Sequence, residues 1–150
     1  MTIDTTIALI GIGVNIFGFL FVSRQIRMQA LATRGETYTS LCGLSYDILR
    51  LITDKPFLYN YVYHGKRLSS TVADEERVQV LLCVEMIANY CDNVALQREN
   101  IPDVTWQRWR TFIKEQVESS PELNRFLRQF ESWYSPDIAS ILREVPPPAA

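Results

Sequence analysis

The feature that most constrains this chain is an apolar run close to its N-terminus. No residue from Thr5 to Ser23 is charged. At ~1.5 Å per residue a helix of this length reaches roughly 28 Å, which is close to the ~30 Å hydrocarbon core of a bilayer. The run therefore predicts one transmembrane helix, and we assign residues 1–23 to a membrane anchor.

Two other readings of the run are a cleaved signal peptide and a buried core helix. Signal peptides begin with basic residues, whereas this chain begins "MTIDTT" and carries Asp4. The "ALA" at residues 30–32 resembles a cleavage site, but Arg24 and Arg27 separate it from the apolar run. These flanks favour an uncleaved anchor, and a core helix remains the structural alternative.

The charges beside the anchor predict its orientation. Arg24, Arg27 and Arg34 follow the span, and only Asp4 precedes it. By the positive-inside rule the N-terminus lies outside and the rest of the chain is cytoplasmic, at the inner (plasma) membrane. Residues 24–35 then form a basic juxtamembrane stalk, in which Arg24 and Arg27 are candidates for contacts with lipid headgroups.

The anchor also carries a pattern typical of helix association. Ala8, Gly11, Asn15, Gly18 and Val22 are spaced 3, 4, 3 and 4 residues apart, which places them on one seam of a helix. Small residues allow close backbone approach in lipid, and Asn15 needs a hydrogen-bond partner there. We expect the seam to pair with a second copy of the chain or with another membrane subunit.

Beyond the anchor every strong signal is helical. No Asn-Gly or Asp-Gly hairpin dipeptide occurs, and no alternation of strands and helices is visible. We expect an all-α fold in which the single N-terminal transmembrane helix continues into a small cytoplasmic bundle of about five helices. The expected segments are a first helix to about Ile52 with a break near Gly35, a short one after Pro56, and longer ones over 73–100, 106–118 with Asp103 or Thr105 as its cap, 121–132 and 136–144.

The bundle occupies residues 36–145 in this scheme, and residues 146–150 form a proline-rich tail. "SSPE" and "YSPD" each place a serine before a proline and an acid, which is typical of a helix start. One inward-facing stripe is expected on the helix after Pro102, formed by Trp106, Trp109, Phe112, Ile113 and Val117.

Glu85 is the polar residue that fits its surroundings least. It lies in "VQVLLCVEMIANYC", which is apolar around most of a helix, so we expect it to be buried. A buried carboxylate must be paired, hydrogen-bonded or neutral. An arginine or tyrosine inside the bundle would serve, and a ligand or proton-linked site is the functional alternative.

The remaining chemistry is sparse. His64 is the single histidine, and the three cysteines form no CxxC, so we expect no metal, no cofactor and no catalytic residue. The net charge of −2 favours no nucleic-acid partner. A solvated loop is the favoured interpretation of the segment with Lys66 and Arg67, and contact of these two residues with headgroups or a small anion is the alternative.

Several motifs together resemble a known group of proteins. These are the arginine-bearing stalk, "CVEMIANYCDNV", "WQRWRTF", "SSPELNRFL" and the closing "WYSPDI". With the single N-terminal span, they look like an uncharacterised family of small bacterial proteins that have one transmembrane helix and an all-helical domain. The resemblance implies an architecture and supplies no catalytic residue.

The sequence thus favours a membrane-anchored helical module for binding or assembly. The first alternative is an accessory or effector subunit of a membrane complex. The second is an enzyme that uses the region of Glu85. The bilayer itself is the partner with the clearest basis in the residues.

Overall fold

The computed structural model describes the backbone of residues 3–148, and the side chains of residues 1–20, 27, 30–34, 37 and 38 lie outside the described part. The chain divides into two compact units, residues 1–38 and 39–150. No strand occurs in the described residues, so the expected all-α class is confirmed. The helices are α1 (Ile3–Asp54), α2 (Leu58–Tyr63), α3 (Asp74–Leu96), α4 (Asp103–Ser119), α5 (Pro121–Gln129) and α6 (Pro136–Glu144), with short 3₁₀ helices η1 (Arg98–Asn100) and η2 (Glu131–Trp133).

Helix α1 is more continuous than expected. It runs without interruption through Gly35 and Gly43, so the predicted break near Gly35 is wrong. A glycine weakens a helix by about 1 kcal/mol relative to alanine, which lowers its stability without forbidding its geometry. A Cβ added at either glycine would meet nothing within 4 Å, so no packing requirement holds these positions to glycine.

The membrane anchor is not supported by the described residues. None of the helices searched among them is both long and apolar enough to cross a bilayer. The expected span falls largely on residues 1–20, whose side chains lie outside the described part, although its backbone is helical from Ile3 onward.

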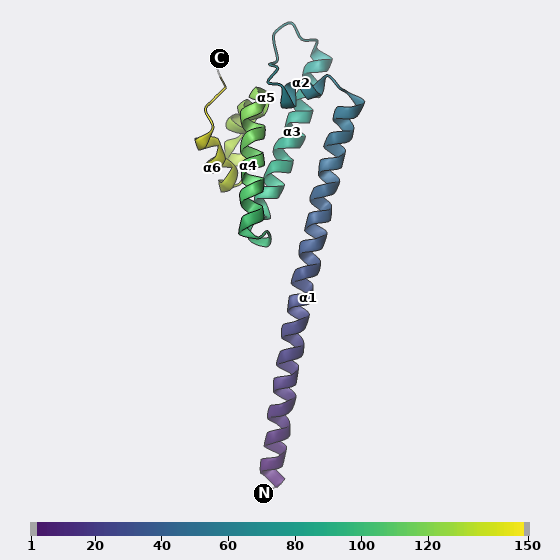
Figure 1. Cartoon of the computed structure of the whole chain (residues 1–150), viewed down its shortest axis with the longest axis vertical. Coiled ribbons are helices and arrows are strands. Elements are labelled where there is room, and N and C mark those ends of the chain that lie inside the picture. Colours follow the sequence, from purple (N-terminus) through teal and green to yellow (C-terminus); the bar gives the residue numbers. More distant parts are fainter. Residues whose placement is uncertain (1–2, 149–150) are drawn as a thin grey trace. The chain divides into compact units, whose positions relative to one another are not determined.

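The bundle is organised around α3, which contacts α2, α4, α5 and α6 (Figure 1). Its buried side chains recur every three or four residues, which gives one continuous inward face. They are Val80, Cys83, Val84, Ile87, Ala88, Tyr90, Cys91, Val94 and Ala95. Leu41, Ile48 and Ile52 from the end of α1 and Leu58, Tyr61 and Val62 from α2 belong to the same core.

The two serine-proline helix starts are both present, but only one serine caps its helix. Ser120 Oγ accepts a hydrogen bond from Leu123 N (3.3 Å) and donates one to Tyr61 O (2.8 Å). Ser135 makes no such side-chain bond, and its buried Oγ has no partner among the described residues. Its backbone N–H instead donates to Asp92 Oδ1 of α3 (2.7 Å), so the start of α6 is joined to α3.

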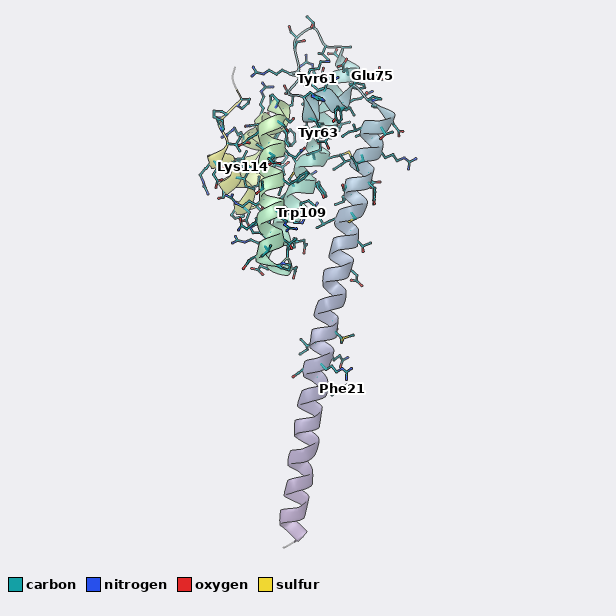
Figure 2. The ribbon with its side chains drawn as sticks, viewed as in Figure 1. Phe21, Tyr61, Tyr63, Glu75, Trp109 and Lys114 are labelled. Atoms are coloured by element: carbon teal, nitrogen blue, oxygen red, sulfur yellow. The ribbon has the colours of Figure 1, made fainter. Side chains whose placement is uncertain are left out.

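The inward stripe of α4 is confirmed for three of its five residues. Trp106, Ile113 and Val117 are buried. Trp109 is half-buried beside α3, with its ring centroid 6.2 Å from that of Tyr90 (Figure 2). Phe112 is exposed, with its ring centroid 5.7 Å from that of Trp109.

Candidate functional site

The expectation that Glu85 is buried is wrong. Glu85 is exposed, and within the described residues it makes no hydrogen bond or ion pair. The side of α3 that packs in the bundle holds Val84 and Ile87, and the 100° step of an α-helix carries Glu85 round to the opposite side. The apolar residues that flank Glu85 in the sequence are therefore divided between a buried side and an exposed side of α3.

The exposed side of α3 is unusually apolar. Val78, Leu82 and Leu96 are 53%, 55% and 60% exposed. Leu81 and Met86 are also exposed beside them. We call these five residues the α3 outer face. They leave on the order of 400 Å² of apolar surface in water, which is in the range of the largest apolar patch on a typical monomer and is often functional.

Acidic groups lie along the same side of α3. Glu85 sits between Leu82 and Met86, and half-exposed Asp92 lies seven residues further on. The pKa of Tyr134 is raised, first by burial and then by the negative charges of Glu85 and Asp92, which therefore lie near its ring. Asp92 Oδ1 is held by Ser135 N, whereas the Glu85 carboxylate is open to a partner. The α3 outer face is thus apolar with an acidic stripe.

Lys66 and Arg67 are both exposed, and their side chains have different surroundings. Lys66 Nζ lies 3.4 Å from Glu76 Oε1 and 4.4 Å from the centre of the Tyr61 ring. Tyr61 Oη donates to the same Glu76 oxygen (2.7 Å), and this bond is the main cause that lowers the pKa of Glu76. Lys66 is thereby engaged with Glu76 of α3 and with Tyr61 of α2, which Figure 2 labels.

Arg67 is exposed and contributes to a different feature. It lines an open cavity of about 310 Å³ together with Pro121, Asn124 and the prolines of the tail. One α5 side chain holds the start of this tail, since Asn124 Nδ2 donates to Pro146 O (3.0 Å), and a second, Arg128, donates to the carbonyl oxygens of Leu142 and Val145 at the end of α6. The cavity is therefore walled by the ordered start of the proline-rich segment.

The other predicted contact residues are placed only in part. Arg24 is exposed on α1, and the side chain of Arg27 lies outside the described residues. The side chains of Ala8, Gly11, Asn15 and Gly18 are outside them as well. The predicted association seam accordingly stays a prediction.

Glu122 is the buried carboxylate that the sequence analysis missed. It is 4% exposed, and its Oε1 accepts from Leu68 N (3.0 Å) while its Oε2 accepts from Arg125 Nη1 (2.6 Å). The bond from Leu68 N joins the loop between α2 and α3 to the start of α5, and Arg125 neutralises the carboxylate from within α5. The acid in "SSPE" is equally typical of an exposed helix start, so its pattern carries no signal of burial.

The cysteines of α3 are poorly suited to covalent chemistry. Burial raises the pKa of the Cys83 thiol to about 11 and that of Cys91 to about 12. Both are therefore protonated at neutral pH, and the thiolate is the nucleophilic form. Among the residues that the structure describes, no group of three His, Cys, Asp or Glu side chains could hold a metal ion.

No family model, curated protein or solved structure matches this chain. The geometry of the chain's own residues is thus the basis for its proposed function.

Proposed function

We propose that this protein is a membrane-anchored binding module whose partner docks on the α3 outer face. The observation that supports it is the exposure of five large apolar side chains on one side of a helix whose other side is fully packed. Such a face stabilises a complex when it is covered, because apolar surface is then removed from water.

The membrane part of the proposal comes from the sequence. Residues 1–23 anchor the chain once in the inner membrane, with the N-terminus outside and residues 24–150 cytoplasmic. The seam that contains Gly11 and Asn15 pairs two anchors or joins one to another membrane subunit. The alternative is an accessory or effector subunit of a membrane complex, in which the docking partner is another subunit of that complex. In both cases the architecture resembles that of the small bacterial helical proteins named above.

Site-specific photocrosslinking in cells tests the docking surface. A photoreactive amino acid at Leu82, in the centre of the α3 outer face, should give discrete crosslinked products. The control position is Gln129, which is exposed and belongs to α5 instead of α3. Equal products at both positions, or none at Leu82, would show that the α3 outer face is not a docking surface.

A further inference from the structure

The exposed side of α3 has the spacing of a helix-packing seam. Val78, Leu82, Glu85, Asn89, Asp92 and Leu96 follow one another at intervals of 4, 3, 4, 3 and 4 residues. This 3–4 spacing is what one α-helix presents to another that lies along it. All of these residues are exposed except Asp92, which is half-exposed. The seam is about 27 Å long, which suits a partner helix of about 20 residues.

The ionisable groups on the seam are all acidic. Glu85 and Asp92 lie within it, and Asp74 and Glu75 lie at the beginning of α3 on the same exposed side. Tyr134 borders it, and because its pKa is raised the phenol stays neutral and adds no charge to the seam. Arg77, the single base of α3, is half-buried on another side and donates to Ser69 O (2.8 Å).

These charges argue against a second copy of the chain as the occupant. A parallel copy would set Glu85 against Glu85 and Asp92 against Asp92 across the seam. An antiparallel copy would bring the two Glu85 carboxylates within about one helical turn of each other, with no cation on the seam. Asn89 is neutral, so a hydrogen bond from its amide would leave both acids without a counter-charge. Burying like charges without compensation opposes association.

We propose that the seam binds an amphipathic helix of another protein that carries two basic residues seven positions apart. Its apolar residues cover Val78, Leu82 and Leu96, and its two bases meet Glu85 and Asp92, which are themselves seven residues apart. Because that spacing reads the same in both directions, it fits a parallel or an antiparallel partner. This inference rests on the α3 outer face being the docking surface, and it adds the chemistry of the partner.

The area of the seam indicates how strong the contact is. The apolar face has on the order of 400 Å² of surface, and the polar seam residues and the matching surface of the partner add to the buried area. The whole interface then buries about 1,200 Å² or less, which is the lower limit for stable protein–protein interfaces. Such a contact is transient, and the two ion pairs contribute selectivity and speed of association more than affinity.

Two synthetic helical peptides of about 20 residues test the proposal. Both carry leucines at 3–4 spacing and differ at two positions seven apart, which are arginine in one peptide and glutamate in the other. Binding is measured by fluorescence anisotropy on the full chain in lipid nanodiscs. The arginine peptide should bind about tenfold more tightly, and high salt should narrow this difference.

Matched charge reversals locate the effect. Glu85→Arg should abolish or invert the preference for the arginine peptide. Glu115→Arg makes the same change in net charge at an exposed position of α4, and should leave the preference in place. Circular dichroism of each variant checks that the helices are retained.

Three results would overturn the inference: no preference for arginine in the wild type, an equal effect of the two charge reversals, or self-association of the chain that is lost in Leu82→Ser. Crosslinking at Leu82 separates this failure from that of the proposed function. Products that persist without a preference for arginine would leave the docking surface standing and reject the basic helix.

Discussion

At the scale of single residues, Glu122 and Glu85 exchange the roles that the sequence suggests. Glu122→Ala should lower the free energy of unfolding by about 1–3 kcal/mol, because half-buried Leu68 N and the guanidinium of Arg125 lose the buried carboxylate that accepts from them. Glu85→Ala should change it by no more than about 0.5 kcal/mol, since Glu85 is exposed. Urea unfolding of both variants measures the difference. A larger loss in Glu85→Ala than in Glu122→Ala would reverse this assignment.

At the scale of elements, ion pairs join the middle of α4 to the end of α6. The Glu144 carboxylate accepts from Arg110, and Lys114 Nζ lies 3.6 Å from Glu144 Oε2. The hydrogen bond from Arg110 is the main cause that lowers the pKa of Glu144 below 4.5. Because the pKa of Glu144 is lowered in the folded state, its ion pairs add to the free energy of unfolding above pH 4.5. This stabilisation is lost as the pH falls through the pKa of Glu144 in the folded state.

This pairing predicts a shift that nuclear magnetic resonance can follow. In Arg110→Gln the pKa of Glu144 should rise toward 4.5, because the largest cause of the lowering is gone. Arg108→Gln removes the same charge from an exposed position of the same helix and serves as the control. An unchanged pKa of Glu144 in Arg110→Gln would show that α4 and α6 are not joined through this pair.

At the scale of the whole molecule, the anchor is expected to bring copies together. Gly11→Leu places a bulky group on the predicted seam and should weaken association in a transmembrane dimerisation assay. Gly13→Leu makes the same change off the seam and should have little effect. Because hydrogen bonds in membranes contribute only about 0.6–2 kcal/mol, we expect a partial loss in Asn15→Leu as well. Equal association of Gly11→Leu and Gly13→Leu would show that the anchor does not pair through the seam that contains Gly11.

The helical class and several helix starts follow from the sequence by itself. Proline after serine begins α5 and α6 at Pro121 and Pro136, as predicted, since proline suits the first helical position and has no N–H to leave unpaired. The apolar period of α4 correctly placed Trp106, Ile113 and Val117 in the core. These features depend on local stereochemistry and on periodicity, which a single chain displays directly.

Only the tertiary structure decided which side of α3 is buried and which acid lies in the core. Large apolar residues lie on both sides of α3, so they do not by themselves distinguish the face that packs from the face that stays exposed; the positions of α4, α5 and α6 do. "SSPE" and "YSPD" are nearly the same locally, yet Glu122 is buried against Leu68 N, whereas Asp137 lies at the surface with Arg98 (3.0 Å). The partners that separate these two acids are 54 and 39 residues away in the chain, and long-range packing alone brings them together.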